Sequence, residues 1–211
     1  MRMVHKNSET VGVDEVGKGA LFGPVFAGAV LLDENAEIIL LNAGLKDSKL
    51  LTSKKRAILV PLIKQEAQSW ALGQASQKEI DLIGIRSATE KAMIRALEKL
   101  KNPPEMVLVD GVLPIRLWRG SQKTLVQGES KYPAIAAASV LAKEARDELI
   151  KRLADIYPGY GLETNVGYGS KFHREALVKI GPTSLHRKSF LSKLLPSTSV
   201  HSQSKAILDT N

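Results

Sequence analysis

Four acidic side chains stand in or just after predicted β-strands. Asp14 and Glu15 interrupt the apolar stretch VGVDEVGKGALFGPVFAGAV, residues 11–30. Asp110 closes the run MVLVD, and Glu129 follows TLVQG. A single such acid is more often a turn or helix-cap residue, but acids at the ends of several strands can converge on one edge of a sheet. The set of four therefore favours a shared site over four separate turn residues.

A shared site of this kind predicts metal-dependent chemistry. Carboxylates held together repel one another, which raises some of their pKa values, and divalent cations relieve that repulsion. Mg²⁺ and Mn²⁺ prefer carboxylate oxygen, and no cysteine is present to select a softer ion. We therefore expect Mn²⁺ or Mg²⁺ as the cofactor, with two ions during catalysis, a site that suits hydrolysis of a phosphodiester.

The spacing of the acids leaves two points open. Adjacent residues of a strand point to opposite faces, so Asp14 and Glu15 share a site only if the strand ends, bends or twists there. Gly17 and Gly19, just downstream, permit such an irregularity. Asp147 is a rival fourth acid, but its place inside a long predicted helix favours a surface or helix-pairing role.

The composition excludes several classes of protein. The 211 residues are 44% hydrophobic and 25% charged, which is ordinary for a globular protein with one large domain. Cysteine is absent, which excludes disulfides and cysteine-bound zinc and fits a cytoplasmic protein. No apolar run is long enough for a membrane span, and the first residues lack the apolar segment of a secretory signal. We therefore expect a cytoplasmic protein.

The charge distribution indicates a polyanionic partner. The formal net charge is +8, and residues 171–193 hold six basic residues against the single acid Glu175. A solvated surface is an equally good interpretation of charge alone. The alternative is a surface that follows a phosphate backbone.

The hydrophobic pattern predicts an α/β domain with a mixed sheet and a smaller helical appendage. Apolar runs of strand length alternate with segments of helical period. The predicted strands are residues 11–16, 25–33, 69–76, 106–111 and 123–130. The predicted helices are a segment that ends near residue 66 and is capped by Thr52 or Ser53, residues 77–100 with a break near Gly84, and residues 133–156. Residues 157–193 predict the appendage, and the Ser-rich residues 194–211 predict a disordered tail.

Five ordered motifs resemble ribonuclease HII, the type 2 ribonuclease H family. They are GVDEVGKGALFGPV, GLKDSKLLTSKKR, LVDG, GESKYPAIAAASVLAKEARD and GYGSKFHREAL…GPTSLHRKSF, in the family's order over about residues 11–190. The resemblance implies a ribonuclease H-like mixed sheet flanked by helices, with a catalytic domain over residues 11–193 after a short extension, 1–10. It implies an endonuclease that cleaves RNA in RNA–DNA hybrids, and a monomer is the default expectation for the oligomeric state. It also implies cleavage 5′ to single ribonucleotides in duplex DNA, with 3′-hydroxyl and 5′-phosphate products.

The resemblance also assigns roles to residues, with three departures from the family pattern. The metal-binding and catalytic acids fall on Asp14, Glu15, Asp110 and Glu129, where the family usually has Asp at the last position. The substrate-binding Gly-Arg-Gly motif falls on Gly17, Lys18 and Gly19, whose backbone is expected near the 2′-hydroxyl. The tyrosine that senses the RNA–DNA junction falls on Tyr168, followed by Gly169 in place of Pro. Metal preference, rate and the phosphate contact of Lys18 therefore stay open.

Further substrate contacts are expected from polar residues near these motifs. The candidates for phosphate contact are Ser48, Lys49, Lys143, Arg146, Arg187 and Lys188, and Ser130 and Lys131 flank Glu129. A solvated surface role is an equal alternative for each of them taken alone. His173 is expected to support the appendage rather than to bind metal with His186.

Three other functions compete with the nuclease. A catalytically weak module that only binds RNA–DNA hybrids draws support from Lys18 and Glu129, although all four carboxylates persist. The sister family, ribonuclease HIII, usually carries an N-terminal binding domain and lacks the glycine-rich and junction-tyrosine pattern. A transcription factor that reads DNA sequence fits poorly, because no recognition-helix motif stands out.

Overall fold

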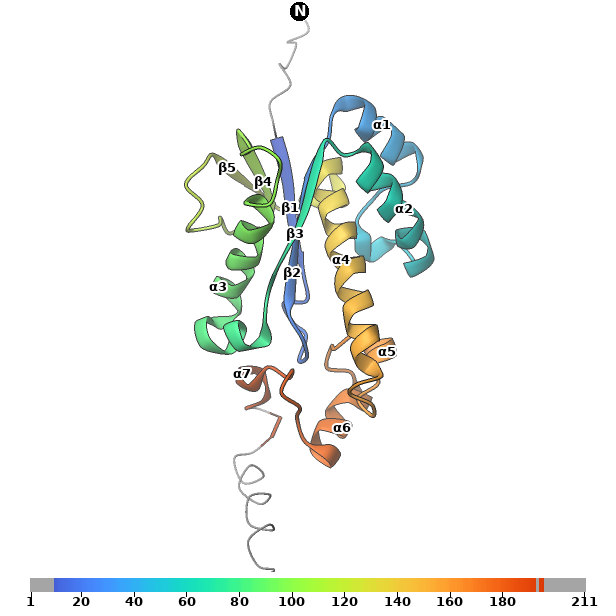
Figure 1. Ribbon diagram of the computed structural model, residues 1–211, viewed down its shortest axis with the longest axis vertical. Helices are drawn as coiled ribbons and strands as arrows, with labels where there is room; N and C mark the ends of the chain where they lie inside the picture. Colours follow the sequence, from blue (N-terminus) through green and yellow to red (C-terminus); the bar gives the residue numbers. More distant parts are fainter. Residues whose placement is uncertain (1–9, 193, 196–211) are drawn as a thin grey trace, which may run out of the picture.

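A five-stranded sheet forms the centre of the protein, with helices on both faces (Figure 1). The computed structural model describes residues 10–192, 194 and 195, so most of the expected extension (1–10) and tail (194–211) lies outside the described residues. The strands are β1 (Thr10–Val16), β2 (Val25–Leu31), β3 (Ser69–Ala75), β4 (Met106–Asp110) and β5 (Gln122–Leu125), in the spatial order β3-β2-β1-β4-β5. The first three pair antiparallel, whereas β4 runs parallel to β1 and to β5. The predicted mixed sheet is confirmed.

Two long helices cover the sheet from opposite sides (Figure 1). They are α3 (Gln77–Leu97) on one face and α4 (Pro133–Ala154) on the other, where α2 (Ser53–Glu66) packs on α4. The predicted cap of α2 is confirmed, since the Thr52 hydroxyl accepts a hydrogen bond from the Lys55 amide. The predicted break in α3 also occurs, at Gly84 with φ 77°.

Helix α1 (Glu34–Asn42) was not among the predicted helices. The Asp33 side chain caps it by accepting the Ala36 amide at 2.8 Å. Ile38, Ile39 and Leu41 are all exposed, so apolar residues lie on its outer side as well. The segment therefore lacks the one-sided apolar stripe that identifies a helix from sequence.

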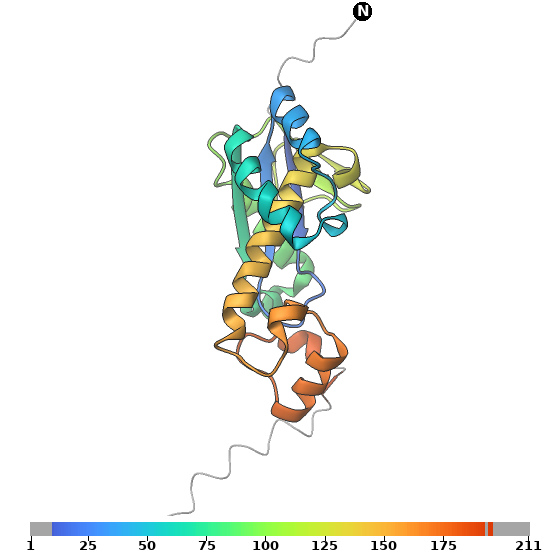
Figure 2. The ribbon, with the colours of Figure 1, turned by 90° about the vertical axis from the view of Figure 1, so that its right-hand side faces the viewer.

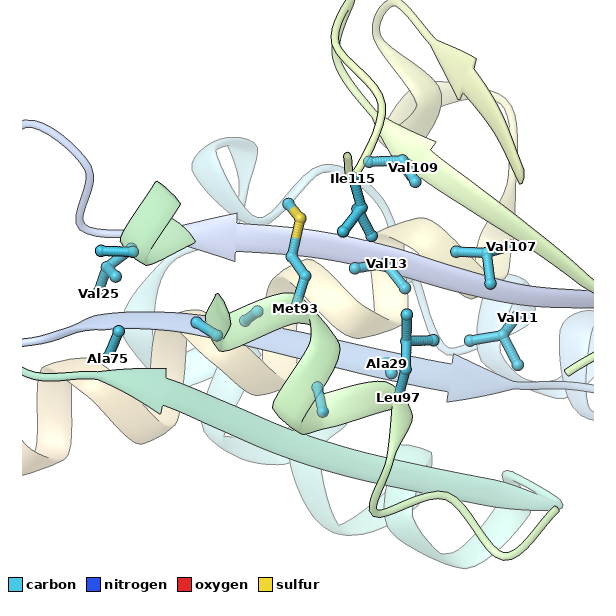
Figure 3. Close-up of a cluster of buried hydrophobic side chains, with 14 of the residues drawn as sticks. Val11, Val13, Val25, Ala29, Ala75, Met93, Leu97, Val107, Val109 and Ile115 are labelled. Atoms are coloured by element: carbon cyan, nitrogen blue, oxygen red, sulfur yellow. The ribbon is translucent and has the colours of Figure 1, made fainter. Parts of the chain in front are cut away.

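The core consists of two layers, one on each face of the sheet. Toward α3 the strands present valines that pack on Met93 and Leu97 (Figure 3). Toward α4 the contact is closer, because β1 and β2 present Gly12 and Gly28 to the helix backbone. A methyl group at Gly28 would overlap the backbone carbonyl of Ala138. The small residues of AIAAAS in α4 thus let helix and sheet approach almost backbone to backbone.

The appendage packs against the end of the sheet where β1 turns into β2 (Figures 1 and 2). It contains α5 (Leu162–Asn165), α6 (Lys171–Ile180) and α7 (Lys188–Leu191). Its own apolar cluster includes Phe22 from the β1–β2 loop and Ile150 from α4. The loop and the appendage therefore share one core. No helix in the described ranges is long and apolar enough to cross a membrane.

The close approach of sheet and helix predicts an unusual response to a glycine-to-alanine change. Gly28→Ala will lower the free energy of unfolding by about 1–3 kcal/mol, because the added methyl group forces α4 away from the sheet. Urea unfolding followed by circular dichroism measures the change. The matched control is Gly19→Ala, where a Cβ has no neighbour within 4 Å. Equal stability of the two variants would contradict the close packing.

Candidate active site

The four predicted acids lie around one end of the parallel strands. The parallel pairing of β1 with β4 stops at Val13 and Val109, so Asp14 and Asp110 each follow the last paired residue. Glu129 lies beyond β5, in the short 3₁₀ helix η2 (Gly128–Ser130). The predicted strand 123–130 is thus shorter than expected, since β5 ends at Leu125. The acids are close enough to influence one another's ionisation.

Asp14 and Glu15 reach this site from opposite faces of β1. The strand stays regular, with Asp14 opposite Gly28 and Glu15 opposite Ala27, so the expected bend or end at this point does not occur. Asp14 is buried toward α4, close enough to Ser139 for that side chain to favour its ionised form. Glu15 lines a cavity of about 260 Å³ on the α3 side, together with Asp110. The two carboxylates flank an edge of β1 that β4 no longer covers.

Burial and mutual repulsion shift the pKa values of these acids. Burial and the charge of Glu15 raise the pKa of Asp14 to about 7. Burial, together with a hydrogen bond to Glu129, raises the pKa of Asp110 to about 6. Burial opposes ionisation of Glu129 too, but the same hydrogen bond and the charge of Lys49 hold its pKa below the usual value. The raised pKa values show that nearby positive charge does not balance the negative charge of the carboxylates.

The residues fit a divalent cation. Among the described residues, Glu129 Oε2 is buried without a hydrogen-bond partner, and every donor in the set is a carboxylate oxygen. In the same residues no group of three or more acids or histidines is already close enough together to hold a metal ion. Hard cations accept such oxygen donors with several remaining water ligands, so a partial protein shell suffices. Asp14, Glu15, Asp110 and Glu129 are the residues that would hold the metal.

Two lysines flank the acids. The Lys18 ammonium lies 2.5 Å from a Glu15 oxygen, and that of Lys49 lies 3.5 Å from Glu129 Oε1. Their side chains are 57% and 73% exposed, which leaves both free to turn toward a phosphate. The expectation that these two contact substrate is compatible with their positions. Ser130 is exposed as well, and its hydroxyl donates to the Gln127 carbonyl at 2.8 Å.

Other expected phosphate contacts are occupied within the protein. Ser48, in the short helix η1 (Ser48–Leu50), is buried and shares a hydrogen bond of 2.8 Å with Ser139. Lys143 pairs with Asp147 at 2.7 Å, and Asp147 also lies 3.5 Å from Arg56 of α2. Asp147 is therefore a buried residue that pairs α4 with α2, and the surface alternative for it is wrong.

Arg146 and Arg187 require a correction. Both were expected to contact phosphate, but both are 0% exposed. The guanidinium of Arg146 donates to the carbonyls of Phe22, Pro24 and Val166, and that of Arg187 donates to those of Lys18 and Gly23. The two arginines therefore hold the β1–β2 loop from inside. They do so by donating hydrogen bonds to its backbone carbonyls.

The glycine-rich loop and Tyr168 lie together. Ala20 forms a β-bridge with Tyr168, and the Leu21 amide donates to the Gly167 carbonyl at 2.8 Å. Gly17 adopts φ 90°, a conformation that favours glycine, whereas Gly19 is open to its surroundings. Motifs about 150 residues apart in the chain thus form one surface beside Glu15.

Glu90 is a site residue that the sequence reasoning missed. It lines the cavity beside Glu15 and Asp110, although its side chain is only 5% exposed. It accepts hydrogen bonds from Arg86 and Arg116 and thereby ties the loop after Asp110 to α3. On the sequence, Arg86 and Glu90 read as an ordinary i,i+4 pair of a solvated helix, so no local signal indicated burial.

A pair of buried histidines supports the Tyr168 segment. His186 Nδ1 accepts the Thr183 amide at 2.9 Å, so neutral His186 carries its proton on Nε2. That proton is donated to His173 Nε2 at 3.1 Å, and His173 Nδ1 then donates to the Tyr168 carbonyl at 2.9 Å. One set of tautomers satisfies the whole chain. His173 lies in α6 and supports the appendage as expected, and its ring bonds with that of His186.

Comparison with known proteins indicates the family. A family model described as ribonuclease HII matches residues 11–193. A ribonuclease HII of Prochlorococcus marinus (strain NATL1A) is 67% identical over 183 residues, which cover 87% of this chain and 94% of the relative. The crystal structure of ribonuclease H2 from Pyrococcus horikoshii OT3 matches with a TM-score of 0.74 at 26% identity, over 88% and 96% of the two chains. Bst-RNase HIII in complex with Mn²⁺ matches with a TM-score of 0.66 at 20% identity, over 89% and 66%, which shows a shared fold alone.

The histidine pair predicts a pH-dependent stability. Burial and the neighbouring His173 lower the pKa of His186 from 6.5 to about 4. Between pH 6.5 and pH 4 the histidine is therefore protonated in the unfolded chain but neutral in the folded one. The contribution of neutral His186 to stability is complete above pH 6.5 and is lost as the pH falls toward 4. The stability advantage of the parent protein over His186→Gln will shrink by about 2 kcal/mol between pH 7 and pH 5.

Thermal or urea unfolding of both proteins at several pH values measures this difference. The comparison removes the contribution of the acids, which both proteins share. A difference that stays constant from pH 7 to pH 5 would show that His186 is not held neutral in the folded state.

Proposed function

Because the chain belongs to the ribonuclease HII family, and is thus an endoribonuclease of RNA–DNA hybrids, we propose that its four acids bind divalent cations for this hydrolysis. The observation that carries the proposal is the collection of carboxylates around the open edge of β1, with Glu129 Oε2 unpaired among the described residues. We propose that the cleavage leaves 3′-hydroxyl and 5′-phosphate ends. The substrates proposed are RNA–DNA hybrids and DNA duplexes that contain single ribonucleotides, cut on the 5′ side of the ribonucleotide.

The carboxylates prepare the site for metal. When bound, Mg²⁺ or Mn²⁺ would supply the activation of water and the neutralisation of charge on the leaving oxygen. Asp14 is oriented by Ser139, and the Glu15 amide donates to Asp14 Oδ1 at 2.7 Å. Asp110 Oδ1 accepts the Gly128 amide at 2.8 Å, which ties Asp110 to the turn that carries Glu129. In Asp14 and in Asp110, one carboxylate oxygen is thus bound to a backbone amide of the protein.

The neighbouring loop and tyrosine supply the preference for a ribonucleotide. Lys18 and Gly19 are exposed, and the open surroundings of Gly19 allow a sugar to come close, so that backbone groups can bond with its 2′-hydroxyl. Tyr168 is half-buried, with its ring supported by the Arg146 guanidinium at 5.4 Å. Its exposed part is suited to stacking on the next sugar. Lys18 and Lys49 then contact phosphates without reading base sequence.

The hybrid-binding module remains the second candidate, and activity distinguishes it from the nuclease. The ribonuclease HIII alternative falls away, since the family model is that of ribonuclease HII over residues 11–193. Cytoplasmic location is a further proposal, which the absence of cysteine supports. A monomer is the default proposal for the oligomeric state.

The first experiment is cleavage of a DNA duplex that carries one ribonucleotide, with Mg²⁺, with Mn²⁺ and with chelator. We expect a single cut 5′ to the ribonucleotide that requires metal. Asp14→Asn will lower kcat/KM about 100-fold or more, because metal ligation contributes several kcal/mol. Its melting temperature will not fall, since Asn removes a buried charge. Tight binding of the duplex without cleavage under either ion would favour the hybrid-binding module.

Glu129 tests the metal site separately. Glu129→Asp will retain cleavage and change the ratio of the rates with Mn²⁺ and Mg²⁺, because the carboxylate is one methylene shorter. Glu129→Gln will lose about 10- to 100-fold in kcat/KM. The control Glu175→Gln alters an acid that is 64% exposed on α6 and will behave like the parent protein. Parent-like activity of Glu129→Gln would remove Glu129 from the proposed ligands.

A further inference from the structure

Arg146 sits at the junction of the two segments proposed to read the ribonucleotide. Nε donates to the Pro24 carbonyl at 3.0 Å and Nη2 to that of Phe22 at 3.0 Å, both in the β1–β2 loop. Nη1 donates to the Val166 carbonyl at 2.9 Å, two residues before Tyr168. All three nitrogens of one planar group are therefore engaged, and they span both segments.

Two further contacts place the recognition residues directly on this guanidinium. The Tyr168 ring lies over it, with 5.4 Å between the ring centroid and the central carbon of the guanidinium. Gly17 also lies against this group, since a Cβ at Gly17 would overlap the arginine side chain. The first glycine of the loop and the tyrosine thus rest on the same group.

The burial of Arg146 indicates a positional role. The side chain is 0% exposed, and among the described residues it forms no ion pair with a carboxylate. Burial accordingly lowers its pKa from the ordinary value. An apolar side chain of similar volume would leave the three carbonyls that Arg146 binds without this donor, which costs stability. The planar fork is what an apolar side chain cannot replace, because only the fork fixes three carbonyls in one plane.

Arg187 anchors the same loop independently. Its Nε donates to the Gly23 carbonyl and its Nη1 to that of Lys18, both at 2.9 Å, and its amide donates to the Leu21 carbonyl at 2.9 Å. It bonds with the loop alone, whereas Arg146 bonds with the loop and with the tyrosine segment. The two segments also pair directly, through the Ala20–Tyr168 bridge and the Leu21 and Phe22 amides on the Gly167 carbonyl. Of the two arginines, only Arg146 adds side-chain hydrogen bonds to both segments.

We propose that Arg146 is a positioning residue that joins residues 17–24 and 166–168 into one rigid unit and so sets the selectivity for a ribonucleotide next to DNA. The inference rests on the proposed function, in which the loop contacts the 2′-hydroxyl and Tyr168 the adjoining sugar. Recognition of both at once requires a fixed spacing between them. In the part of the chain that the structure describes, Arg146 forms no hydrogen bond or ion pair with the four acids, so its effect acts on selectivity more than on the chemical step.

The test compares two substrates with Arg146→Lys, which keeps the charge and loses the fork. One substrate is a duplex with a single ribonucleotide, and the other is a continuous RNA strand on DNA. We expect kcat/KM to fall about 10- to 100-fold on the first and less than about threefold on the second. On a strand with an RNA–DNA junction, the single cut site of the parent protein will spread over several positions. The control is Arg152→Lys, an exposed arginine of the same helix.

A double-mutant cycle separates positioning from general damage. If Arg146 acts through Tyr168, Arg146→Lys will add little to the loss of selectivity in Tyr168→Ala. Additive losses, or equal losses on both substrates, would overturn the proposal.

If the Arg146 variant fails to fold, a measurement on the parent protein still tests the proposal. Amide hydrogen exchange should show residues 17–24 and 166–168 opening together, with equal free energies. Separate opening would also overturn the proposal. A parent protein that cuts neither substrate would refute the proposed function instead, and the exchange result would still decide whether the unit exists.

Discussion

The parallel pairing of β1 with β4 is the constraint on which the site depends. Its register places Val13 beside Val109, so the next residues along the two strands are both aspartates. The pairing ends there and leaves the edge of β1 open, which lets acids from opposite faces of the sheet approach the same region. A shift of one residue would turn Asp14 toward α3 and a valine toward Ser139. The hydrophobic core excludes that shift, because it would bury the carboxylates among the valines of the α3 layer.

Helix α4 transmits this arrangement to the rest of the protein. Gly12 and Gly28 let it lie against the sheet, which brings Ser139 to Asp14. Arg146 lies seven residues further along, about two turns or roughly 10 Å of helix. One helix thus supports the acids at one point and the β1–β2 loop at another. Because the packing against the sheet is so close, the two groups are held at a set distance, and a movement of α4 would disturb both.

The protein buries charge in two different ways. Burial and the neighbouring acids raise the pKa of Asp14 and of Asp110. The same repulsion favours the binding of cations. The two arginines instead lie among backbone carbonyls beneath the loop and the appendage. Both arrangements cost stability relative to an apolar core. These losses of stability occur at the regions proposed to bind metal and nucleic acid. The aliphatic layers on both faces of the sheet offset them.

The sequence by itself determined the type of fold, the set of acids and the family. Strand-length apolar runs and the helical stripe of α4 are local patterns, and so each could be recognised without knowledge of its neighbours. The order of the motifs indicated the family for the same reason. Helix α1 was not predicted, because its apolar residues face outward as well as inward.

Only the tertiary structure decided which charged residues are exposed. Arg146 and Arg187 look like surface cations in the sequence, as do Lys18 and Lys49, yet the first two are buried and the last two are exposed. Glu90 and Asp147 likewise read as ordinary helix acids and are in fact buried in ion pairs. The physical reason is that the burial of a charge depends on the acceptors and counter-charges that distant segments bring to it. Here those partners come from residues up to 169 positions away in the chain, where no local pattern can report them.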